Sequence, residues 1–215
     1  MSAPATPERR VGPGRLVATL GGAGAMAGAL IVLVYQGTQP TILAHKARQL
    51  AEAVEEVLAA PARYDTLYVV DGALTRSAPG GAAAGERLYL GFASDGVPIG
   101  YAIETQKPGF QDVVRLIFGY DPVRDRLLGM KVLENKETPG LGDKIEKDSS
   151  FVAEFAGAAP PLVGVKPGAA GGDRSEAVDM ITGATISSRT VIAAINEALE
   201  RYRPMIERYE AGGGR

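Results

Sequence analysis

The chain of 215 residues contains no cysteine and a single histidine, His45. Without thiols it cannot form disulfides, ligate iron–sulfur clusters, attach haem through Cys-x-x-Cys-His or use a cysteine nucleophile. A single histidine also leaves little basis for a Ser-His-Asp triad or a histidine-rich metal centre. We therefore expect no independent catalytic triad and no metal site, and we expect His45 to be a solvated surface residue.

The sequence also lacks a strong basic balance. It has 23 Lys and Arg residues against 25 Asp and Glu residues, for a formal net charge of -2. Beyond residue 35 no run or stripe of basic residues stands out. Proteins that bind nucleic acid neutralise phosphates with such a basic surface. The composition therefore argues against nucleic-acid binding.

One long apolar run is present near the N-terminus. Residues 16–35 read LVATLGGAGAMAGALIVLVY and contain no charge, and at about 1.5 Å per residue they span roughly the 30 Å of a hydrocarbon core. A cleaved signal peptide is the alternative, although its apolar core is usually about 7–15 residues and ends at a small-x-small site. Arg9, Arg10 and Arg15 precede the run, and the next Lys or Arg is Lys46. The positive-inside rule then predicts a single-pass anchor with the N-terminus in the cytoplasm and residues 36–215 outside it.

Composition and periodicity predict five segments along the chain. Thr38 or Gln39 is expected to cap a second helix with Pro40 in its first turn, and Pro61 to end it. Apolar residues spaced 4, 3, 4 and 3 apart give this helix one apolar face. The expected segments are a cytoplasmic N-terminal tail at 1–15, a transmembrane helix at 16–36, a linking amphipathic helix at 37–60, an extracytoplasmic domain at 61–210 and a disordered tail at 211–215.

The main domain is predicted to be α+β, with an antiparallel sheet and flanking helices. Turn signals at Ser94-Asp95-Gly96 and Asp121-Pro122 indicate two hairpins. A short helix is expected near 148–155, and a final helix from about Ser188 with a kink or break before Pro204. The expected strands are 66–70, 87–93, 97–103, 112–120, 126–133 and 162–166, and the expected Gly/Ala-rich loops are 77–85 and 167–172.

The run Thr182-Gly183-Ala184-Thr185 comes directly before the final helix, for which Ser187 and Ser188 are predicted N-caps. Threonine hydroxyls and free backbone N–H groups at a helix N-terminus stabilise a phosphate. Gly and Ala leave room for its close approach. Taken alone, these residues fit a simple capped turn equally well.

A second run, ETPGLGDKI, occupies residues 137–145. Its proline fixes one backbone dihedral and its glycines allow conformations that other residues resist, so its backbone could lie flat against a planar ligand. Thr138 would supply a hydroxyl, Leu141 an apolar surface and Lys144 a cation. Alone, such a run is typical of an ordinary turn.

Together the two runs resemble a known family. The pattern Asp179-x-x-Thr182-Gly-Ala-Thr185 resembles the flavinylation motif of FMN-binding domains, in which FMN is joined through its phosphate to the last threonine. The run at 137–145 resembles the second signature of the G subunits of Rnf electron-transport complexes. The related C subunits of sodium-translocating NADH:quinone oxidoreductases share most of it. The resemblance covers roughly residues 15–208, including the order of membrane helix, loop and Thr-Gly-Ala-Thr.

The resemblance implies a role for each motif residue. Thr185 would be the covalent FMN attachment site, Thr182, Gly183 and Ala184 would line the phosphate, and Asp179 would serve recognition by a flavin transferase. The residues along the isoalloxazine ring and ribityl chain would be Glu137, Thr138, Leu141, Gly142 and Lys144.

The implied function is that of an electron-transfer subunit of a membrane-bound, ion-translocating oxidoreductase complex. Its partners would be the other membrane subunits of an Rnf-type complex, and a flavin transferase during maturation. It would be part of an enzyme as the flavin-bearing subunit of a translocase. Three alternatives stay open: a C subunit of a sodium-translocating NADH:quinone oxidoreductase, a stand-alone membrane-anchored flavoreductase, and an anchored assembly domain in which Thr185 only begins a helix.

Overall fold

The computed structural model describes residues 12–77, 85–169 and 175–213. The chain divides into two compact units, Met1–Arg48 and Gln49–Arg215. The tails expected at 1–15 and 211–215, and the loops expected at 77–85 and 167–172, fall partly outside the described residues.

The first helix, α1, runs without interruption from Pro13 to Val57. The second helix start predicted at Thr38 or Gln39 is therefore wrong, since Pro40 lies inside α1. Proline removes one hydrogen bond from a helix, here to the carbonyl of Gln36, and the turns on either side continue the helix through it.

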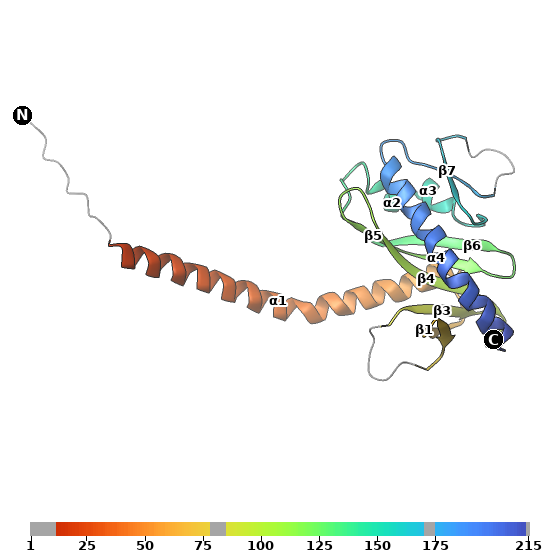
Figure 1. The fold of residues 1–215 in the computed structure, drawn as a ribbon, viewed down its shortest axis with the longest axis horizontal. Helices are drawn as coiled ribbons and strands as arrows, with labels where there is room; N and C mark the ends of the chain where they lie inside the picture. The colour runs from red at the N-terminus through yellow and green to blue at the C-terminus, as the bar shows by residue number, and fades with distance from the viewer. Residues whose placement is uncertain (1–11, 78–84, 170–174, 214–215) are drawn as a thin grey trace, which may run out of the picture. The chain divides into compact units, whose positions relative to one another are not determined.

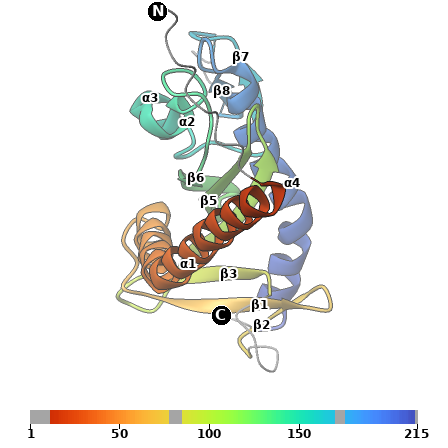
Figure 2. The same ribbon diagram turned by 90° about the vertical axis from the view of Figure 1, so that its left-hand side faces the viewer.

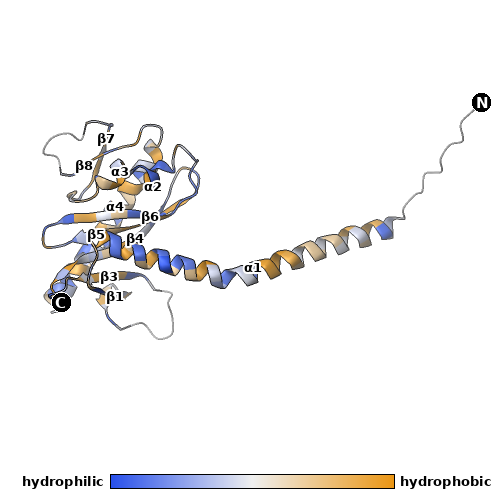
Figure 3. Cartoon of the chain, turned by 180° about the vertical axis from the view of Figure 1, so that it is seen from behind, coloured by the Kyte–Doolittle hydropathy of each residue, from blue (hydrophilic) through white to orange (hydrophobic). Residues whose placement is uncertain are grey.

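The apolar part of α1 fits the predicted anchor. Among the described helices, α1 is the one long and apolar enough to cross a membrane, and its apolar window is exposed within the chain. Figure 3 shows hydrophobic colour concentrated in its N-terminal part and hydrophilic colour in its later turns. His45 is exposed, as predicted.

Six strands of the described chain form one antiparallel sheet, in the order β2-β1-β3-β4-β5-β6. Both predicted hairpin turns are present; in the first, the N–H of Gly96 donates to the carbonyl of Ala93 at 2.9 Å. The strands are β1 (Arg63–Val70), β2 (Ala73–Thr75), β3 (Arg87–Phe92), β4 (Pro98–Pro108), β5 (Val113–Asp121) and β6 (Arg126–Glu134).

Each face of this sheet is covered by a helix, because apolar side chains point to both sides of its central strands. On one face, side chains such as Leu90 and Phe118 form the larger core with α4 (Thr185–Ala211). On the other, Tyr89 and Ile117 pack against the last turns of α1, including Val54. Figures 1 and 2 show α4 lying along the sheet. The predicted α+β class with an antiparallel sheet is confirmed.

Smaller elements complete the domain beside α4. They are α2 (Lys144–Lys147), α3 (Ser149–Ala153) and a parallel pair of strands, β7 (Val163–Val165) and β8 (Ala177–Asp179). These elements bring the loop that follows β6 and the segment that precedes α4 to the same end of the domain (Figure 1).

Two predictions about α4 are wrong. The helix begins at Thr185 with Ala184 as N-cap, so Ser187 and Ser188 lie inside its first turn rather than at its cap. It also runs through Pro204 without a break. Tyr202 and Ile206, on either side of that proline, are buried in the core, and this packing holds the helix together where one hydrogen bond is missing.

Candidate functional site

The first turn of α4 presents hydrogen-bond donors outward. Thr185 and Ile186 are exposed, whereas Ser187 and Ser188 are buried. Ala184 at the N-cap has no polar side chain, so the first N–H groups of α4 have neither an intrahelical acceptor nor a side-chain cap. Gly183 has φ +82°, a conformation that glycine adopts readily and that turns the chain into the helix. This helix start is therefore suited to a negatively charged group.

Ser187 and Ser188 stabilise this turn through hydrogen bonds on its buried side. The Ser188 hydroxyl donates to the carbonyl of Ala184 at 2.9 Å and accepts from the N–H of Ile181 at 3.1 Å. The Ser187 hydroxyl donates to Glu137 Oε2 at 2.7 Å. The two serines thus face inward, and the neighbouring Thr185 is left facing outward.

The loop between β6 and α2 is a tight turn closed by Asp143. Its Oδ1 accepts from the N–H of Gly140 at 2.7 Å and its Oδ2 from Lys147 Nζ at 2.6 Å. The hydrogen bond from Lys147, helped by the Gly140 N–H, holds the pKa of the Asp143 carboxyl below its ordinary value. The loop therefore has a fixed shape in which Leu141 is displayed at the surface.

The two sequence runs meet at a single cavity of about 360 Å³. A Cβ built on Gly183 would lie 3.5 Å from Leu141 Cδ2, which shows that the runs are in contact. The residues that line the cavity are Phe110, Glu137, Thr138, Leu141, Gly142, Gly183, Ala184, Thr185, Ile186 and Ser187.

The cavity combines an apolar surface with backbone donors. Phe110, Leu141 and Ile186 keep 68%, 49% and 52% of their surface exposed. Large apolar side chains gathered around a cleft are typical of a ligand or partner site. Such a cleft can receive a flat apolar group between these side chains and an anion at the start of α4.

Three of the predicted site residues lie outside the cavity lining. Thr182 is exposed on the turn before the helix. Lys144 is the first residue of α2, where its carbonyl accepts from the N–H of Asp148. Asp179, in β8, accepts from the N–H of Gly168 at 2.7 Å through Oδ2.

Three residues of the cavity were missed from the sequence. Phe110 lies in the loop between β4 and β5, far along the sequence from both motif runs. An aromatic residue in a hairpin loop was the one local signal for it, and in the structure this side chain is exposed. Ile186 and Ser187 directly follow the Thr-Gly-Ala-Thr run, and their cavity positions follow from the early start of α4.

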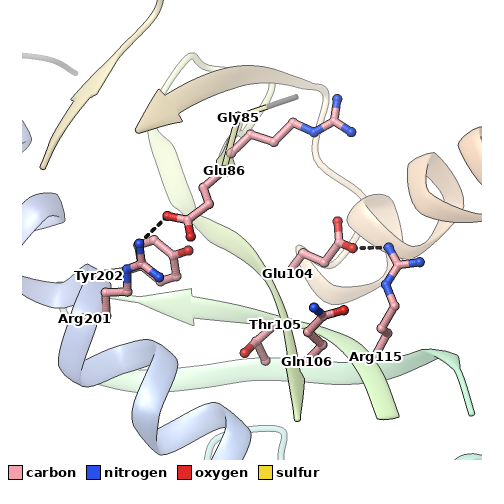
Figure 4. Close-up of a pocket in the computed structure, with 9 residues that line it drawn as sticks. Gly85, Glu86, Glu104, Thr105, Gln106, Arg115, Arg201 and Tyr202 are labelled. Atoms are coloured by element: carbon pink, nitrogen blue, oxygen red, sulfur yellow. Dashed lines mark hydrogen bonds and ion pairs between the residues drawn. The ribbon is translucent and has the colours of Figure 1, made fainter. Parts of the chain in front are cut away.

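A second, larger cleft of about 610 Å³ lies beside the C-terminal half of α4. Two of its arginines are paired with glutamates: Arg115 binds Glu104 and Glu134, and Arg201 binds Glu86 at 2.6 Å. Figure 4 shows the Glu86–Arg201 and Glu104–Arg115 pairs on opposite sides of this cleft. The charges of Arg115 and Arg201 are thereby already compensated.

Comparisons with known proteins identify the family to which this chain is similar. The family model described as an FMN-binding domain matches residues 109–200, which include both motif runs and Phe110. A Yersinia pestis protein, named as the G subunit of an ion-translocating oxidoreductase complex, is 34% identical over 195 residues, covering 86% of this chain and 88% of that protein. The protein of the same name from Methanosarcina acetivorans is 30% identical, covering 86% and 92%.

Solved structures share the fold. The crystal structure of NqrC from Shewanella oneidensis superposes with a TM-score of 0.63 at 16% identity, covering 78% of this chain and 99% of that chain. The C subunit of the Na(+)-translocating NADH-quinone reductase from Parabacteroides distasonis superposes with a TM-score of 0.53 at 23% identity, covering 67% and 77%.

Proposed function

Because this chain belongs to the family of G subunits of ion-translocating oxidoreductase complexes, we propose that it carries FMN and relays electrons within such a complex. The observation that carries the proposal is the meeting of the two sequence runs at one cavity. Residues from the loop after β6 and from the start of α4 are brought together there, and each contributes what one part of FMN requires.

The residues present fit FMN. Phe110, Leu141 and Ile186 offer apolar surface for a flat ring system. The first N–H groups of α4 and the positive end of its dipole suit the phosphate. Thr138 and the backbone at Gly142 belong to the same lining and suit the ribityl chain.

Thr185 is the proposed point of covalent attachment, through a phosphoester to the FMN phosphate. It is the threonine of the run that is both exposed and part of the cavity lining, at the first position of α4. Thr182 is exposed but outside that lining, which suits a contact near the phosphate or with the flavin transferase rather than attachment. Asp179 is proposed as a recognition residue for that transferase.

FMN supplies one-electron and two-electron transfer when it is bound. The residues of this chain hold the ring, fix its phosphate and limit access of water. The side chain of Glu137 is buried, and its oxygens already accept hydrogen bonds from within the protein. The chain acts as the flavin-bearing subunit of a larger oxidoreductase.

The anchor places this function in a membrane. The apolar part of α1 would cross the inner membrane once, with the N-terminus cytoplasmic and the flavin domain outside. The partners would be the other membrane subunits of the complex. A covalent tether suits a domain outside the cytoplasm, where a lost cofactor could not be replaced from the cytoplasmic pool.

The test is a pair of matched threonine variants, produced together with a flavin transferase. Thr185→Val removes the hydroxyl but keeps the shape, and we expect no flavin fluorescence on a denaturing gel. Thr182→Val is the matched comparison and should still carry covalent flavin, at or below the wild-type load. Fluorescence retained by Thr185→Val, or lost only in Thr182→Val, would contradict the assignment. Co-purification of the wild-type chain with several polytopic subunits separates membership of a complex from a stand-alone flavoreductase.

A further inference from the structure

Glu137 is buried deeper than the other motif side chains of its loop. It is 5% exposed, and both of its carboxylate oxygens are used. Oε1 accepts from the N–H groups of Phe110 at 3.0 Å and Gln111 at 3.1 Å. Oε2 accepts from the hydroxyl of Ser187 at 2.7 Å. A buried carboxylate of this kind is stable because donors surround it.

These bonds join three segments that are far apart in the sequence. Phe110 and Gln111 lie 27 and 26 residues before Glu137, and Ser187 lies 50 residues after it. Each of the three segments contributes residues to the cavity lining. Gln111 adds a second link to the same loop, since its Oε1 accepts from the Thr138 hydroxyl at 3.2 Å.

Two glycines leave the space that the carboxylate occupies. A Cβ on Gly109 would lie 2.4 Å from Glu137 Oε1. A Cβ on Gly142 would lie 2.7 Å from Glu137 Oε2 and 2.9 Å from Ser187 Oγ. Distances this short would force backbone or side chains to move, so the carboxylate fits closely between the three segments.

We infer that Glu137 is a positioning residue that does not itself bind FMN. Its hydrogen bonds to Phe110, Gln111 and Ser187 form a brace, which holds three segments of the cavity lining together. Through Ser187 it fixes the first turn of α4, and with it the outward direction of Thr185. Through the N–H groups of Phe110 and Gln111 it fixes the loop between β4 and β5, which also contributes to the cavity lining. This role differs from the place along the ring that the sequence resemblance implied. Its consequence for flavin attachment rests on the proposed function, whereas the brace itself is a property of the protein alone.

Hydrogen exchange tests the brace without flavin. The full-length chain is purified in detergent, and copies that mass spectrometry shows to be unmodified are compared. In Glu137→Ala we expect the amides of Phe110 and Gln111 to exchange about tenfold faster or more, because they lose a charged acceptor. The amide of Leu116 in β5 should exchange as in the wild type. Unchanged protection at Phe110 and Gln111 would overturn the inference.

The matched variant is Glu137→Gln. Its amide oxygen can still accept from both N–H groups and its NH₂ can donate to Ser187, so protection should stay close to that of the wild type. If Glu137→Ala fails to fold, Ser187→Ala replaces it. That variant should keep both amides protected and lower the fraction of chains that carry flavin.

Flavin load, measured by intact mass after production with a flavin transferase, gives the second readout. We expect the order wild type, then Glu137→Gln, then Glu137→Ala. Loss of flavin in Glu137→Gln with wild-type exchange would show that the carboxylate contacts the flavin or the transferase, and would overturn a positioning role. A wild-type chain without any flavin would instead refute the proposed function and leave the exchange result to decide on the brace.

Discussion

Two of the clefts along α4 differ in how their polar groups are used, and the smaller of these two is the better candidate site. The cleft near Arg201 has a volume of about 610 Å³, against about 360 Å³ for the cavity at Thr185. In the larger cleft, Arg115 and Arg201 are already bound to glutamates. At the smaller one, the first N–H groups of α4 have no intrahelical acceptor. Volume alone therefore does not identify a binding site; groups that still require a partner do.

The two clefts also differ in how their charge is compensated. Carboxylates in the larger cleft are paired with partly exposed guanidinium groups, an arrangement that contributes little to stability. The one buried carboxylate at the smaller cavity is held by two backbone N–H groups and a serine hydroxyl. Fixed donors define a shape, so substitutions should affect the smaller cavity more strongly than the larger cleft.

The largest expected effect follows from Gly142→Ala. The added Cβ would lie 2.7 Å from Glu137 atoms, and overpacking of this kind typically destabilises by about 1–3 kcal/mol. We expect both a lower denaturant midpoint and a lower flavin load by intact mass. Gly129→Ala is the control, since a Cβ there would meet no atom within 4 Å. Equal denaturant midpoints and equal flavin loads in the two variants would contradict the close fit around Glu137.

A smaller effect is expected in the larger cleft from Arg115→Ala. The change leaves Glu104 and Glu134 without their guanidinium partner, and for partly exposed pairs the loss should be about 1 kcal/mol. Flavin load should stay at the wild-type level, because the substitution is remote from the cavity lining. A flavin load that fell with Arg115→Ala and also with Arg87→Ala, which lines the same cleft, would reassign the flavin site to the larger cleft.

The pH dependence of the 137–143 loop gives a third test. The pKa of Asp143 is lowered in the folded protein, so its contribution to stability is fully present above the unfolded pKa of about 3.9. That contribution is lost as the pH falls through the lower folded value. Denaturant midpoints of the wild type and Asp143→Asn should therefore differ at pH 6 and converge under strong acid. Lys147→Met should lose the same increment, and a difference that grew on acidification would contradict the assignment.

Phe110→Ala should have the smallest effect on stability. The ring is 68% exposed, so its removal should change the free energy of unfolding by no more than about 0.5 kcal/mol. Its loss should, however, uncover the flavin. We expect covalent load to be kept and quenching of flavin fluorescence by iodide to increase relative to the wild type. Unchanged quenching would mean that Phe110 does not cover the ring.

Much of the fold could be predicted from the sequence because its signals are local. Hairpin turns such as Ser94-Asp95-Gly96 and alternating apolar strands specify an antiparallel sheet without knowledge of distant residues. The start of α4 was predicted wrongly because that prediction also relied on local signals alone. Ser187 and Ser188 are good caps locally, but their hydroxyls are engaged by Glu137, Ala184 and Ile181 inside the first turn of α4.

The candidate site was predictable only in part, for a related reason. The motif runs at 137–142 and 182–185 carry chemical signals of their own. Phe110 lies outside both runs, and it is held at the cavity by a hydrogen bond to Glu137, which lies 27 residues later in the sequence. The role of Glu137 could not be predicted either, since a glutamate on a loop is exposed in most sequences. Its burial depends on partners from two other segments, which only the folded chain brings together.

The most direct test is the mass of one peptide. Trypsin should release residues 175–189, which contain both Thr182 and Thr185, from protein purified from its native membrane. We predict that this peptide carries an added mass equal to FMN minus water and that fragmentation places it on Thr185. An unmodified peptide, or a modification placed on Thr182, would contradict the central claim that the start of α4 is the site of flavin attachment.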